Sequence, residues 1–138
     1  MPRRDSRQPL VNLTLTVLPE RLAVCHLPPA SDLPIWATIG PLFVVARTAD
    51  ELSILCPERQ VPAEIVREEG WRALKFEGPF NFGLTGILAS VVGPLAEAAI
   101  SVFAFSTYET DYVLVREAQL DPAIKVLSDR GHLVRPPR

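Results

Sequence analysis

The stretch ISVFAFSTYETDYVLV, residues 100–115, contains two apolar runs that flank a short polar centre. Runs rich in β-branched and aromatic residues predict strands, here over 101–106 and 111–116, which together would form a hairpin. The centre has no glycine but gathers hydroxyl and carboxylate groups, namely Ser106, Thr107, Glu109, Thr110 and Asp111. Such groups either satisfy the backbone of a solvated turn or bind a ligand, and the stretch by itself leaves both interpretations open.

The segment before this hairpin predicts a strand followed by a long helix. The strand is expected over WRALKFEG, residues 71–78, and the helix over NFGLTGILASVVGPLAEAA, residues 81–99. Apolar residues recur in this helix at the spacing of one helical face: Leu88, Val91, Val92 and Leu95. Because Pro94 has no amide hydrogen and crowds the preceding turn, we expect a kink or a break there.

The segment after the hairpin predicts a second helix and a short closing strand. Asp121 is the expected N-cap, Pro122 the first helical residue and Gly131 the C-terminal stop. HLVR, residues 132–135, would then add a strand. The resulting order of strand, helix, strand, strand, helix and strand is ferredoxin-like. It predicts an α+β fold with an antiparallel sheet and helices on one face.

The first half of the chain echoes this pattern in degenerate form. One helical turn is expected within residues 30–38, a polar connector over 61–70, and strands over 11–18, 21–27, 42–48 and 51–57. With a shift of 60 residues, the apolar pattern of FVVARTADELSILCP falls on that of FAFSTYETDYVLVRE, so that Glu51 aligns with Asp111.

This weak repeat predicts two βαββαβ-type halves that share one continuous structure. We expect a flexible arm over 1–10, a first and degenerate half over 11–62, and a second, more complete domain over 63–138.

Composition excludes several classes of function. The formal net charge of the 138 residues is −2, and the basic residues are scattered, so nucleic acid is not an expected partner. No apolar run approaches the roughly 20 residues that cross a bilayer, and the start MPRRDSRQPL lacks an apolar targeting core. We therefore expect a cytoplasmic protein that does not bind membranes, with Cys25 and Cys56 as free, buried thiols.

Catalytic and metal-binding motifs are absent from the sequence. His26 and His132 are the only histidines, and His26 is the strand neighbour of Cys25, so their side chains should point to opposite faces. No zinc, nucleophile-elbow or phosphate-loop motif occurs. We expect no catalysis, no cofactor and no metal.

One combination of residues favours a small zwitterionic ligand. In EGPFNFGLTGILAS the glycines give the backbone freedom, and the amides at the start of the helix would stabilise a carboxylate. The competing interpretation is a turn that is capped by its own Asn81 or Thr85. Asp111, where the hairpin re-enters the sheet, could bind an ammonium or guanidinium group, with Ser106 and Thr107 beside it. A free amino acid carries both charges.

The string WRALKFEGPFNFGLTGILASVVGPLAEAAISVFAFSTYETDYVLV resembles the ACT domain, a ferredoxin-like module that senses amino acids. More broadly, residues 13–134 resemble short bacterial proteins of two ACT-like halves, which are similar to the cytosolic arginine sensors of animals. This resemblance implies a ligand in a cleft between ACT units. It matches Asp111 to the acid that meets the ligand, Thr107 and Tyr108 to neighbouring pocket positions, and the loop to Gly83, Leu84 and Thr85.

The resemblance has a limit, because this chain has one tandem pair where the animal sensors have two. Our first hypothesis is a regulatory homodimer that binds an amino acid and transmits the event to an unknown protein partner. The alternative is a ligand-free ACT pair that acts as an interaction scaffold. A third possibility is an enzyme that uses the Asp111 region as a general base.

Overall fold

The computed structural model describes residues 12–78 and 86–137, and the predicted arm over 1–10 lies outside them. Its strands form a single sheet in the order β2-β3-β1-β4-β6-β5, with β7 paired to β1. They are β1 (Thr14–Leu27), β2 (Val44–Arg47), β3 (Leu52–Pro57), β4 (Val66–Phe76), β5 (Phe103–Ser106), β6 (Asp111–Arg116) and β7 (Leu133–Arg135). The helices are α1 (Ala89–Glu97) and α2 (Leu120–Asp129), and the 3-10 turns are η2 (Ile35–Thr38), η3 (Glu58–Gln60) and η4 (Glu117–Gln119).

All strand pairs are antiparallel except the parallel pair of β1 and β7. The predicted α+β class, with helices on one face of an antiparallel sheet, is therefore confirmed, as is the expectation of one continuous structure.

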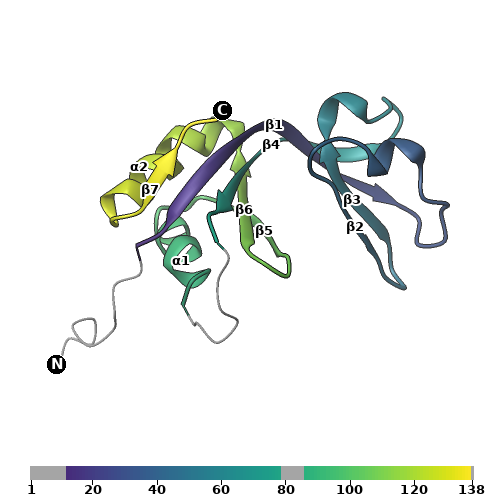
Figure 1. Cartoon of the computed structure of the whole chain (residues 1–138). Coiled ribbons are helices and arrows are strands. Elements are labelled where there is room, and N and C mark those ends of the chain that lie inside the picture. Colours follow the sequence, from purple (N-terminus) through teal and green to yellow (C-terminus); the bar gives the residue numbers. More distant parts are fainter. Residues whose placement is uncertain (1–11, 79–85, 138) are drawn as a thin grey trace.

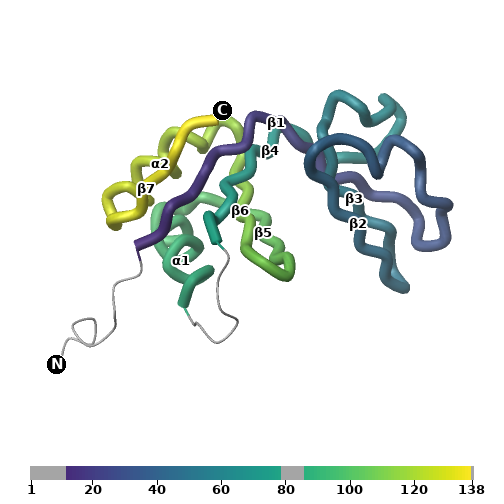
Figure 2. Tube along the Cα trace, viewed as in Figure 1, coloured from purple at the N-terminus to yellow at the C-terminus, as the bar shows by residue number. Residues whose placement is uncertain are grey.

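The long strands β1 and β4 run through both parts of the molecule, from the part with α1 and α2 into the part formed by β2 and β3 (Figure 1). Figure 2 shows the two strands side by side along this path. The prediction of separate strands over 11–18 and 21–27 is wrong, because β1 is continuous from Thr14 to Leu27. A register shift against β4 between Val17 and Arg21 accommodates Pro19, which cannot donate to the ladder.

The helices cover the sheet with the apolar faces that their sequences predict. Val91 and Leu95 of α1 are fully buried, and Leu88 and Val92 pack against the same core. The sheet contributes to this core Leu15, Val17, Leu74, Phe76, Val113 and Val115. Since Leu15 and Val17 lie in β1, the first strand of the chain helps to close the core under the C-terminal helices. The division at residue 62 stays a prediction.

Both helices differ from the predictions at their boundaries. The helix predicted over 81–99 is α1, which begins at Ala89 and ends at Glu97, and it continues through Pro94 without the break that was one of the two expectations there. At α2, the predicted N-cap Asp121 is wrong: η4 leads directly into the helix, so Gln119 is the N-cap residue and Asp121 lies in the first turn. Gly131, with φ of +93°, ends α2 as predicted.

The first half has 3-10 turns and no α-helix between residues 12 and 65. Its core includes Ala23, Cys25, Leu27, Leu52, Ile54 and Cys56, and Ala37 of η2 packs against it. Cys25 and Cys56 are free and buried, as expected. Their mutual hydrogen bond, together with burial, raises the pKa of the Cys25 thiol.

The predicted connector over 61–70 becomes strand β4 from Val66 onward. Its charged side chains pair within the strand and with the neighbouring strand β6. Arg67 pairs with Glu69 at 2.6 Å, and Glu68 pairs with Arg116 of β6 at 2.7 Å.

Candidate functional site

The β5–β6 hairpin brings the predicted polar residues together, and their side chains make different contacts. Thr107 closes the turn: its N–H donates to the Thr110 carbonyl at 2.8 Å, and its Oγ1 accepts from the Thr110 N–H at 3.3 Å. The Thr107 hydroxyl can also donate to the Thr110 carbonyl at 3.2 Å. Its contacts therefore match the structural interpretation of a side chain that satisfies the turn backbone.

Thr110 anchors the hairpin to the neighbouring strand. Its hydroxyl donates to the carbonyl of Phe76, the last residue of β4, at 2.6 Å, and the side chain is buried. This contact fixes the position at which β6 begins. The sequence contains a signal for it only in the fact that Thr110 directly precedes an apolar strand.

Asp111 lies on the helix-covered side of the sheet. It is the first residue of β6, and alternate residues of a strand share a face, so Asp111 is on the same side as Val113 and Val115 in the α1 core. Ser106, directly opposite in the register, donates its hydroxyl to Asp111 Oδ1. Within residues 12–78 and 86–137, no Lys, Arg or His forms an ion pair with this half-buried carboxylate.

The remaining predicted residues fall into two groups. Tyr108 lies at the hairpin tip and is 83% exposed. The predicted loop residues lie outside the described part of the chain, so their relation to Asp111 stays a prediction: Asn81, Gly83, Leu84 and Thr85.

The described start of α1 has properties that suit an anion. Gly86 adopts the left-handed conformation with φ of +81°, and the Ser90 N–H donates to its carbonyl at 2.9 Å. Leu88, the N-cap residue, makes no side-chain hydrogen bond to cap the helix. The Val91 N–H also donates locally, to the Leu88 carbonyl at 3.1 Å, so the feature of this turn that favours an anion is the partial positive charge at the start of a helix.

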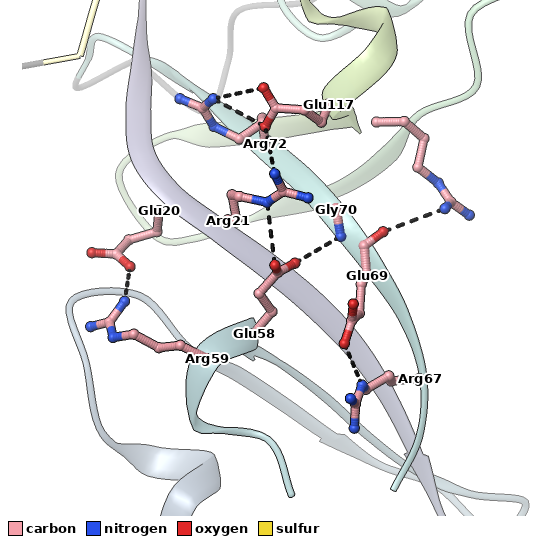
Figure 3. A network of polar contacts seen from close by, with 10 residues as sticks. Glu20, Arg21, Glu58, Arg59, Arg67, Glu69, Gly70, Arg72 and Glu117 are labelled. Atoms are coloured by element: carbon pink, nitrogen blue, oxygen red, sulfur yellow. Dashed lines mark hydrogen bonds and ion pairs between the residues drawn. The ribbon is translucent and has the colours of Figure 1, made fainter. Parts of the chain in front are cut away.

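A polar network that the sequence did not predict joins the two parts of the sheet beside the paired strands β1 and β4 (Figure 3). Arg21 of β1 pairs with Glu58 at 3.2 Å, and Glu58 also accepts the Gly70 N–H at 2.9 Å. Arg72 of β4 pairs with Glu117 at 3.3 Å and donates to the Leu18 carbonyl at 3.0 Å. In these contacts each arginine pairs with a glutamate. The network therefore connects strands and 3-10 turns, and it leaves none of these four charges unpaired for a substrate.

The described residues do not form a metal site, since no group of three or more His, Cys, Asp or Glu lies together in that part of the chain. His26 is exposed and its neighbour Cys25 is buried, as the strand alternation predicts. Neither α1 nor α2, nor any other helix in the described ranges, has the length and apolar character needed to cross a membrane.

Residues 66–129 match the family model of the ACT domain, and residues 20–64 match a second model that describes an N-terminal domain. Subunit 1 of the cytosolic arginine sensor for mTORC1 from Bos taurus is 34% identical in an alignment of 104 positions, which covers 67% of this chain and 32% of the sensor. The chain thus spans about a third of the length of this curated relative.

Two solved structures resemble the whole chain. A crystal structure of a protein from Agrobacterium tumefaciens matches with a TM-score of 0.89 and 34% identity, over 93% of this chain and 96% of that one. Aspartate kinase from Clostridium acetobutylicum matches with a TM-score of 0.63 and 9% identity, over 91% of this chain and 37% of the kinase, which is a likeness of fold alone. Residues 66–129 of this chain are thus an ACT domain.

Proposed function

We propose that this protein is a small regulatory sensor that binds a free amino acid noncovalently and catalyses no reaction. The observation that carries the proposal is the Asp111 carboxylate, which lies on the α1 side of the sheet without a cationic partner in the described residues. The related protein from Bos taurus is named a cytosolic arginine sensor, which supports the same class of ligand.

In this proposal the two charges of the ligand meet two different elements. Asp111 and the Ser106 hydroxyl bind the cationic group, and Thr107 and Tyr108 lie beside it. The amides at the start of α1 bind the carboxylate, together with Asn81, Gly83, Leu84 and Thr85. Ligand binding then favours one arrangement of the loop and helix over another, with a coupling of about 1–3 kcal/mol to whatever partner reads that arrangement.

The protein acts, in the same proposal, as a cytoplasmic homodimer whose partner contact lies on the first half. Residues 33–46 contain no charged side chain, and they include all of the edge strand β2 except its last residue, Arg47. Five of their large apolar side chains are exposed: Leu33, Ile35, Ile39, Phe43 and Val45. An exposed apolar surface of this kind is typical of a protein interface.

A thermal-shift screen with the twenty amino acids at millimolar concentration tests the ligand. A ligand at 100 times its dissociation constant adds about 2.7 kcal/mol to the free energy of unfolding, which raises the melting temperature measurably. Asp111→Asn should abolish the shift, because the neutral amide no longer attracts a cation. Glu109→Gln, which removes an exposed acid from the same turn, should leave it unchanged.

The alternative function, a ligand-free ACT scaffold, is favoured by the same exposed apolar surface. It predicts a stable dimer and no thermal shift with any amino acid. A shift that survives Asp111→Asn would instead keep amino-acid binding and remove Asp111 from the site.

A further inference from the structure

Pro94 leaves one carbonyl of α1 without its regular donor. In an α-helix the carbonyl of a residue accepts from the N–H four residues later, and proline has no N–H. Because Pro94 lies inside α1, the Ser90 carbonyl lacks this backbone partner. A buried carbonyl that lacks a hydrogen-bond donor lowers the stability of the folded protein. A group that donates to the Ser90 carbonyl in place of residue 94 therefore stabilises the fold.

His132 provides that partner from a distant part of the chain. Its Nε2 lies 3.0 Å from the Ser90 carbonyl oxygen, and its Nδ1 accepts the Leu13 N–H at 3.1 Å. Because Leu13 donates to Nδ1, the ring proton lies on Nε2 and is donated to Ser90. The ring is neutral and only 5% exposed, and it uses both nitrogens to join the start of β1 to the first turn of α1.

The end of α2 places the ring in this position. The His132 N–H donates to the Leu127 carbonyl at 3.1 Å and the Gly131 N–H to the Ser128 carbonyl at 3.0 Å. This is the Schellman pattern, and it requires the positive φ of Gly131. The next residue, Leu133, donates to the Leu13 carbonyl at 2.8 Å. Both polar backbone groups of Leu13 are therefore bonded to residues 132 and 133.

We propose that His132 is a positioning residue that replaces the missing Pro94 amide and holds the first turn of α1 against β1. The bond to Ser90 lies one turn from Gly86, where the chain enters the helix. The extension of this role to ligand binding rests on the proposed function, in which the amides of this turn bind a carboxylate. Loosening the turn would then weaken amino-acid binding although His132 does not touch the ligand.

A double-mutant cycle tests the replacement of the donor. His132→Ala should lower the melting temperature by roughly 5–15 °C, because Leu13 and Ser90 each lose a bond. In a Pro94→Ala background, residue 94 regains an N–H for the Ser90 carbonyl, so the same change should cost about half as much. An equal loss in both backgrounds would overturn the proposal. His26→Ala, at the exposed histidine, is the matched control and should have no effect.

Two measurements keep the test decisive if His132→Ala does not fold. Ring ¹⁵N spectra of the natural protein should show Nδ1 without a proton and Nε2 with one, and the opposite tautomer would contradict the proposal. In a folded variant, amide exchange should rise more at Val92 in α1 than at Val113 and Val115 in the sheet. A uniform rise would indicate a general loss of stability and no positioning role.

Ligand affinity separates this inference from the proposed function. If the screen identifies an amino acid, His132→Ala should weaken its binding several-fold, and adding Pro94→Ala should restore part of the affinity. Unchanged affinity in His132→Ala would remove the link to the site. If no amino acid binds, the proposed function fails, while the stability cycle and the tautomer still decide the role of His132.

Discussion

At the scale of single residues, the polar groups of the hairpin have different hydrogen-bond partners. Thr107 and Thr110 bond to the backbone, the first within its own turn and the second to Phe76 on β4. Asp111 accepts from Ser106, which leaves the carboxylate oriented by the hairpin and not neutralised by it. The two threonine hydroxyls thus stabilise the hairpin, and in the proposed function the carboxylate binds the ligand.

Thr110→Val should destabilise the protein by about 1–3 kcal/mol. The substitution keeps the shape but leaves the Phe76 carbonyl without its side-chain donor in a buried position. Thr110→Ser retains the hydroxyl and should cost clearly less. Chemical denaturation of both variants measures the difference, and equal losses would show that packing of the methyl group matters more than the hydrogen bond.

At the scale of elements, the glycine that follows α2 and the glycine inside α1 have opposite effects on stability. Gly131 ends α2 with φ of +93°, and a Cβ there would lie 2.7 Å from Oδ1 of Asn12. Gly93 lies inside α1, and a Cβ there would meet nothing within 4 Å. The first glycine is required by the turn that positions His132, whereas the second only lowers helix propensity.

Gly131→Ala should therefore destabilise the protein by more than about 1 kcal/mol, through backbone strain and the contact with Asn12. Gly93→Ala should stabilise it by about 0.5–1 kcal/mol, because alanine loses less conformational freedom in a helix. Thermal melts of the pair provide the comparison. A stabilised Gly131→Ala variant would contradict the described end of α2.

At the scale of the whole molecule, β1 and β4 join the two unequal halves into one continuous structure. They extend the sheet from the helix-covered ACT domain into a first half that is covered by 3-10 turns. The polar network of Arg21, Glu58, Arg72 and Glu117 joins the two parts along these paired strands. The first half exposes five large apolar side chains, those of Leu33, Ile35, Ile39, Phe43 and Val45. The proposed arrangement therefore separates a ligand-binding end from an association surface.

Phe43→Glu should convert the proposed dimer into a monomer, because it buries a charge in an apolar contact. Sedimentation or light scattering should give a mass of about twice 15.2 kDa for the natural chain and 15.2 kDa for the variant. Leu133→Glu makes the same change at an exposed position of β7 and should remain dimeric. A dimeric Phe43→Glu variant would place the interface elsewhere, and a monomeric natural chain would refute the dimer.

The sequence by itself determined the class of fold, because apolar periodicity, Pro and Gly act locally. The strands at 103–106 and 111–116, the apolar face of α1 and the stop at Gly131 all follow from nearest neighbours along the chain. The same local signals pointed to the polar hairpin and its acid. These signals could not show which hydroxyl of the hairpin has a structural role. The role of Thr110 depends on its hydrogen bond to Phe76, a residue of another strand.

Only the tertiary structure decided the long-range pairings. It merged two predicted strands into β1, turned a charged connector into β4, and brought Arg72 to Glu117. It also brought His132 to Ser90, a bond that spans 42 positions of the chain. The physical reason is that buried charges, carbonyls and amides need partners, and the tertiary fold decides which groups lie close enough to pair. The spacing of residues along the sequence does not predict these pairs.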